Sequence, residues 1–179
     1  KAAAERTVLS NVLQHSNERF PTSAAYRSYL DDLFGTVLYF DTTKRGDEHT
    51  LLLNAETVND QYLADSNVLN EVLELLHTAI FKPNLENGSF KASVVEREKD
   101  MVIQRIQSIF DDKSRLAQQR LTNILRPNHP ASISANGSLE AVEAITPKSL
   151  VEAYEAMLAN DVIDIYVVGD VDVEEMTAK

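Results

Sequence analysis

The sequence has 179 residues, of which 44% are hydrophobic and 25% are charged, the usual composition of a globular domain. Its 28 acidic and 17 basic residues give a net charge of -11, which opposes binding to the phosphate backbone of nucleic acids. The sequence has no cysteine, which excludes disulfides and thiolate metal sites, and no apolar run approaches the roughly 20 residues of a membrane span.

The N-terminal third of the chain predicts two helices followed by a β-hairpin. Apolar residues spaced three and four apart predict helices over residues 3–15 and 23–34. Residues 36–42 are β-branched and aromatic, residues 49–58 are again rich in apolar side chains, and turn-forming residues separate the two segments. We therefore expect an antiparallel hairpin here.

The rest of the chain predicts helices and one returning strand. The helical periodicity recurs over four segments: residues 68–81, 89–112, 113–126 and 147–158. Thr146 is the expected N-cap of the last helix, and Pro147 its first residue. Residues 163–169 are expected to form a buried strand, and residues 170–179 a loose tail. This order indicates a single α+β domain with an antiparallel-rich mixed sheet covered by helices on one face.

The histidines do not predict a metal site. Residues 15–18 match the start of the zinc-protease signature H-x-x-E-H, but Arg19 stands where the second histidine is required. None of the other histidines has a second histidine or cysteine at ligand spacing. The sequence also has no glycine-rich phosphate loop and no G-x-S-x-G motif. The residues alone therefore predict no catalytic constellation, no metal and no cofactor.

Three segments together resemble a known family. They are VVEREKDMVIQRIQSIFDDKSRLAQQRL (94–121), NGSLEAVEAITPKSLVEAYEAML (136–158) and IDIYVVGDVD (163–172). They are similar to the pitrilysin/insulinase-type metallopeptidases, inverted zincins whose active helix carries H-x-x-E-H. The resemblance implies a metallopeptidase-like domain of the LuxS/mitochondrial processing peptidase-like type over residues 1–179, lacking the family's first strands.

The resemblance also implies where a zinc site would lie. Alignment on a Phe-Pro pair places the family's two histidines at Thr7 and Asn11, and its catalytic glutamate at Ser10. Glu98 matches a family glutamate on the long helix, and the third zinc ligand, seven residues on, is replaced by Arg105. Water activation needs a metal and a carboxylate base, so the resemblance implies a catalytically inactive member without zinc.

One strand of the family has a second role. In active members it pairs with extended peptide substrates through backbone hydrogen bonds. It corresponds here to residues 36–42, and the expected peptide-binding residues are Val37, Leu38, Tyr39, Phe40, Asp41 and Thr42. Tyr39 stands where the family usually has an asparagine. Backbone pairing needs no particular side chain, so peptide binding can persist where the chemistry is lost.

These observations give three hypotheses. The first is a silent subunit in the bacterial cytoplasm that pairs with an active paralogous metallopeptidase, or with the C-terminal domain of its own chain, and helps to bind peptide. The second is a stand-alone module that binds a protein or peptide. The third is an active zinc metallopeptidase whose site the alignment misplaces. None of them involves nucleic acid or a membrane span.

Overall fold

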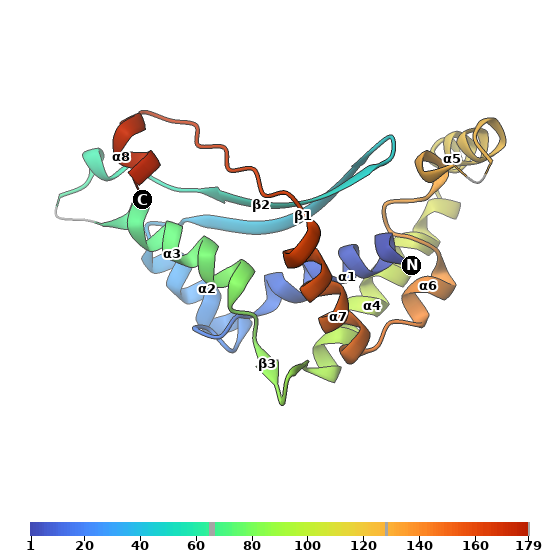
Figure 1. The fold of residues 1–179 in the computed structure, drawn as a ribbon, viewed down its shortest axis with the longest axis horizontal. Coiled ribbons are helices and arrows are strands. Elements are labelled where there is room, and N and C mark those ends of the chain that lie inside the picture. Colours follow the sequence, from blue (N-terminus) through green and yellow to red (C-terminus); the bar gives the residue numbers. More distant parts are fainter. Residues whose placement is uncertain (65–66, 128, 179) are drawn as a thin grey trace.

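The computed structural model describes residues 1–64, 67–127 and 129–178 (Figure 1). Helices α1 (Ala2–His15) and α2 (Ser23–Asp32) precede a long hairpin, β1 (Val37–Arg45) and β2 (Glu48–Glu56). The remaining elements are helical apart from one very short hairpin. They are η1 (Asp60–Tyr62), α3 (Val68–Phe81), β3 (Leu85–Glu86), β4 (Ser89–Phe90), α4 (Ala92–Gln107), η2 (Ser108–Phe110), α5 (Lys113–Leu125), η3 (Pro130–Ser132), α6 (Leu139–Glu143), α7 (Pro147–Asn160) and α8 (Val173–Ala178).

The long hairpin has one face against helices and one face open. Its strands are antiparallel and pair over all nine residues of each strand. Leu38 and Phe40 pack into the apolar clusters formed with the helices, whereas Val37 and Tyr39 on the other face are 49% and 39% exposed. The predicted α+β fold, with helices on one face of an antiparallel sheet, is confirmed.

Helix α1 is the centre of the larger apolar cluster. Its buried members on this helix are Ala4, Val8, Leu9, Val12 and Leu13. They recur at helical spacing around much of the helix, so α1 packs at once against α4, α6, α7 and β1. A smaller cluster joins α2, β1 and α3 beside it. The first helix of the chain is thus the element around which the others are arranged.

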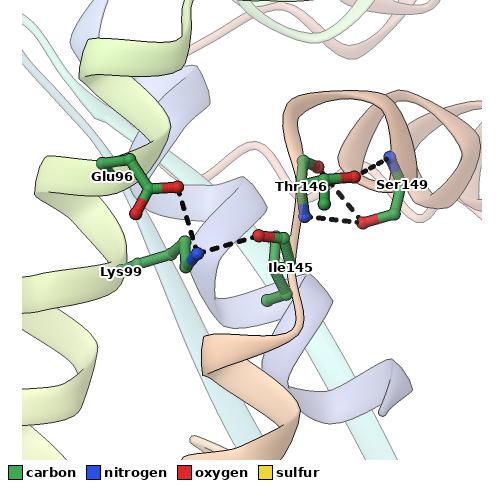
Figure 2. Close-up of polar contacts among 5 residues, drawn as sticks. All are labelled: Glu96, Lys99, Ile145, Thr146 and Ser149. Atoms are coloured by element: carbon green, nitrogen blue, oxygen red, sulfur yellow. Dashed lines mark hydrogen bonds and ion pairs between the residues drawn. The ribbon is translucent and has the colours of Figure 1, made fainter.

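The turn between α6 and α7 is fastened to α4 by polar contacts (Figure 2). Thr146 and Ser149 form a capping box, in which each hydroxyl accepts a bond from the other residue's backbone N–H at 3.1 and 3.0 Å. The Lys99 ammonium donates to the Ile145 carbonyl at 2.9 Å and to Glu96 at 3.1 Å. The predicted cap at Thr146 is confirmed, and Lys99 supplies a partner for a buried carbonyl.

The helix predicted from residue 89 begins later in the structure. Ser89–Phe90 forms strand β4 and pairs with β3, so the helix starts at Ala92. Asn87 and Gly88 between the strands have positive φ values of 53° and 75°. Asn-Gly favours this tight turn because both residues tolerate a positive φ. The turn chemistry decides the local structure here, and the prediction of a helix at residues 89–91 is wrong.

The prediction of a buried strand over residues 163–169 is also wrong. No strand is formed there, and Ile165, Tyr166 and Val168 are 82%, 86% and 97% exposed. A strand requires a neighbour to accept its backbone hydrogen bonds. None of the strands in the described part of the chain pairs with this segment. Its apolar sequence therefore specifies an extended conformation that has no partner in this structure.

Side-chain contacts hold both ends of this segment. The Arg6 guanidinium donates two hydrogen bonds to the Asp161 carboxylate, at 2.5 and 2.6 Å. At the far end, the Asn59 amide donates to the backbone carbonyl of Asp170 at 2.5 Å, and Gln61 donates to its carboxylate at 2.8 Å. The segment therefore runs from α1 to the loop after β2 while its apolar centre stays exposed.

Helix α8 occupies the stretch expected to be a loose tail, and none of its residues is buried. Among the residues that the structure describes, no helix is long and apolar enough to cross a membrane.

Candidate functional site

A pocket of about 360 Å³ lies between α1, α2 and α4. Its lining comes from three helices: Asn11, Gln14 and His15 on α1; Ser23, Tyr26, Arg27 and Leu30 on α2; and Arg97, Glu98 and Met101 on α4. The residues from α1 are one turn apart or adjacent, so a single stretch of that helix faces the pocket. This is the region in which the sequence places the remnant of a zinc site.

The structure brings only one of the four predicted site positions into this pocket. Asn11 lines it. Thr7 is fully buried and its hydroxyl donates to the Ala135 carbonyl at 2.9 Å, while the Ser10 hydroxyl donates to the Thr7 carbonyl at 2.8 Å. Arg105 is exposed on α4 and does not line the pocket. Thr7 and Ser10 therefore have structural hydrogen bonds inside the fold.

Glu98, the carboxylate that lines the pocket, is bound by the adjacent Arg97. Glu98 is 5% exposed, and the Arg97 guanidinium donates from Nε and Nη2 to its Oε1 at 3.0 and 2.6 Å. Burial of a carboxylate is tolerated when such charge-assisted bonds satisfy it. Glu98 thus keeps a hydrogen-bonding role although no metal ligand accompanies it.

The field in the pocket is positive. Burial lowers the pKa of His15, and the nearby charges of Arg97, Lys91 and Arg27 lower the pKa further against the single opposing effect of Glu98. His15 is therefore neutral at pH 7, and the charges around it are mainly cationic. The chain as a whole has a net charge of -11, so the charge around His15 is opposite in sign to that of the whole chain.

Zinc, which the family resemblance implies for active members, does not fit these residues. The pocket offers one carboxylate already bound by Arg97, one imidazole, and two guanidinium groups that repel a cation. Across the described ranges, no three histidine, cysteine, aspartate or glutamate side chains are grouped as a metal site.

The pocket adjoins the free edge of β1 through Gln14. The Gln14 amide donates to the Leu38 carbonyl at 3.2 Å and accepts from the Phe40 N–H at 2.6 Å. A residue of an added strand would use these two backbone groups. The next edge amide, at Thr42, donates to the Asp41 carboxylate at 2.7 Å. The strand predicted to bind peptide is in place, with part of its edge occupied by the chain's own side chains.

Sequence reasoning missed most of this pocket. It considered His15 only as part of a broken motif and did not single out Arg27 or Arg97. His15 and Glu98 lie on helices separated by the whole hairpin and α3, so no local spacing links them. The one signal in the sequence is the family match, which places Glu98 and the first helix near a common site.

Comparison with named proteins gives relatives among metalloproteases. The chain is 38% identical over 169 residues to a Bacillus subtilis (strain 168) protein named probable inactive metalloprotease YmfF, a match that covers 94% of this chain. This match agrees with the resemblance of the chain to the pitrilysin-type metallopeptidases and with an inactive member. A second relative in this family comparison, the putative zinc protease AlbF of the same strain, is 26% identical over 125 residues, which is 68% of this chain and 28% of AlbF. No family model matches the chain.

Two solved structures share the fold of this chain. A conserved protein from Enterococcus faecalis V583 superposes with a TM-score of 0.93 at 32% identity, over 98% of this chain and 42% of that chain. A peptidase M16 inactive domain from Pseudomonas fluorescens superposes with a TM-score of 0.66 at 16% identity, over 87% of this chain and 34% of that chain, and supports the fold alone. The chain also spans only 40% of the length of YmfF.

Proposed function

We propose that this chain is a peptidase-like domain of a silent metallopeptidase subunit in the bacterial cytoplasm. The subunit pairs with an active paralogue, or with a further domain of its own chain, and helps to hold an extended peptide. The observation that carries the proposal is the pocket beside β1, which is lined by two guanidinium groups and, among the described residues, by no set of zinc ligands.

Two features support the loss of catalysis. The Thr7 and Ser10 hydroxyls are engaged with backbone carbonyls, and neither residue type can replace an imidazole ligand and a carboxylate base. The carboxylate that lines the pocket, on Glu98, is bound by Arg97. The relative named as probably inactive matches nearly the whole chain, in agreement with this proposal.

Peptide binding is supported by the exposed edge of the long hairpin. Strand β1 pairs with β2 on one side, and on its other side no strand of the described residues pairs with it. A peptide can add to such an edge through its backbone, with side chains alternately facing the pocket and solvent. The side-chain amide of Gln14 already makes the pair of hydrogen bonds that one residue of such a peptide would make with β1.

The test uses the full-length protein purified from its own cells. We expect less than stoichiometric zinc by elemental analysis, no cleavage of an extended peptide library, and co-purification of a subunit with an intact H-x-x-E-H helix. Stoichiometric zinc together with chelator-sensitive cleavage would establish an active peptidase and refute the proposal. Isolation without any peptidase subunit or further peptidase domain would favour the stand-alone binding module.

Peptide pairing has its own readout. Addition of an extended peptide should slow hydrogen exchange at the β1 amides that face away from β2, such as Phe40 and Thr42, while leaving the amides that join β1 to β2 unchanged. Unchanged exchange along both strands at saturating peptide concentration would refute strand pairing at this edge.

A further inference from the structure

The pocket and the edge of β1 form one continuous surface. Gln14 belongs to both, because its amide bonds the backbone at Leu38 and Phe40 while the residue lines the pocket. A peptide residue that replaces this amide on β1 would therefore lie at the mouth of the pocket. The side chain of that peptide residue, or of the next residue in the peptide, is the nearest group that can enter the pocket.

The pocket offers more cationic and donor groups than acceptors. Glu98 is paired with Arg97 by two hydrogen bonds, so its charge is compensated in place. Arg27 is exposed on α2 and takes part in none of the ion pairs formed among the described residues. The buried Asn11 amide nitrogen likewise finds no acceptor within the described ranges.

These groups match a carboxylate. A guanidinium binds a carboxylate through two parallel hydrogen bonds, and a neighbouring amide N–H can supply a further donor. The cations Arg97, Lys91 and Arg27 also act together on the neighbouring His15 imidazole, which agrees with a positive field at this point. A cationic side chain would meet Arg27 and Arg97, and an apolar one would leave the donors unsatisfied.

We propose that the pocket receives an acidic side chain, a glutamate or an aspartate, of the peptide that pairs with β1, and that Arg27 is its main partner. This inference rests on the proposed function, since it specifies which peptides the silent subunit holds. It assigns to the pocket a specificity for acidic extended peptides in an otherwise acidic protein.

The experiment measures binding of fluorescent extended peptides to the full-length protein by anisotropy. The peptides carry a single glutamate, moved along the sequence, and each has a partner with glutamine at the same place. At one position we expect the glutamate peptide to bind about tenfold tighter than its glutamine partner, with a preference that weakens as salt is added.

The variant Arg27→Ala should abolish this preference, and Arg27→Lys should retain part of it. Arg120→Ala removes the same charge from an exposed site on α5 and should leave the preference unchanged. Circular dichroism of each variant confirms that it is folded. Equal binding of glutamate and glutamine peptides to the wild type would overturn the acidic specificity alone. A preference that persists in Arg27→Ala would place the acid elsewhere and also overturn it, and failure of every peptide to bind would refute both proposals.

Discussion

Gln14 is the residue that links the interior helix to the exposed strand. Its amide occupies the Leu38 carbonyl and the Phe40 N–H, so an added peptide has to displace it. We expect Gln14→Ala to raise the affinity of the full-length protein for extended peptides several-fold, since one competing hydrogen-bond pair is worth about 1 kcal/mol. The measurement is peptide anisotropy, supported by faster hydrogen exchange at Phe40 in the free variant.

A matched control for this change is Gln118→Ala on α5, where the glutamine is exposed and outside the pocket. It should leave peptide affinity unaltered. Weaker binding by Gln14→Ala would mean that the side chain contacts the peptide directly instead of competing with it.

The titration of Tyr26, a buried residue that lines the same pocket, measures how far its ring is shielded from water. Burial raises the pKa of Tyr26 to about 12, since the phenolate would lose its hydration. The neutral phenol is thus favoured in the folded state, and this contribution to stability is present below pH 10 and is lost as pH rises from 10 to about 12. The pKa values of Tyr29 and Tyr154 are raised as well, so absorbance titration near 295 nm should show several late tyrosines, and Tyr26→Phe should remove one that titrates near pH 12. Titration of all tyrosines near pH 10 in folded protein would contradict the burial of this ring.

At the scale of elements, Lys99 on α4 forms the hydrogen bond to the backbone just before α7. In Lys99→Met the Ile145 carbonyl stays buried and loses its donor, which we expect to cost about 1–3 kcal/mol of unfolding free energy. Urea unfolding of this chain measures the loss. Lys148→Met, at an exposed position on α7, is the control and should change stability by less than about 0.5 kcal/mol. Equal effects of the two substitutions would show that the buried contact contributes nothing.

The elements differ in how far the sequence predicts them. The start of α7 could be predicted because Thr146 and Pro147 are local signals, and the long hairpin because its strands are neighbours in sequence. The start of α4 is predicted too early because β3 and β4 take the residues before it, although the Asn-Gly pair between them is a local turn signal. The pocket was also beyond prediction from spacing, because His15, Arg27 and Glu98 meet only through tertiary packing.

At the scale of the whole molecule, the extended segment at residues 162–168 exposes apolar side chains and pairs with no strand among the described residues. Apolar residues such as Ile165 and Val168 are largely exposed, although contacts at Asp161 and Asp170 hold both ends in place. We expect a strand of a partner subunit, or of any further domain of the protein, to pair with this segment. This would complete a sheet that the family resemblance describes as having further strands.

Hydrogen exchange with mass spectrometry tests this proposal. Residues 162–168 should exchange rapidly in the isolated chain and slowly in the full-length protein, whereas the β2 amides that bond β1 should be protected in both. Rapid exchange of the segment in the full-length protein would show that it remains an unpaired edge.

The position of α1 at the centre has a consequence for how the protein is made. Arg6 bonds a residue 155 positions later, and Thr7 bonds one 128 positions later. At about 5–20 residues per second, a ribosome needs roughly 6–30 s to synthesise these distant partners after α1 itself has been made. During that interval β1 and α4 can already pack against α1, but the part of its apolar surface that contacts α6 and α7 has no cover, and contacts this distant in sequence form slowly. Newly made chains should therefore depend on a chaperone that shelters this surface of α1 until α6 and α7 emerge.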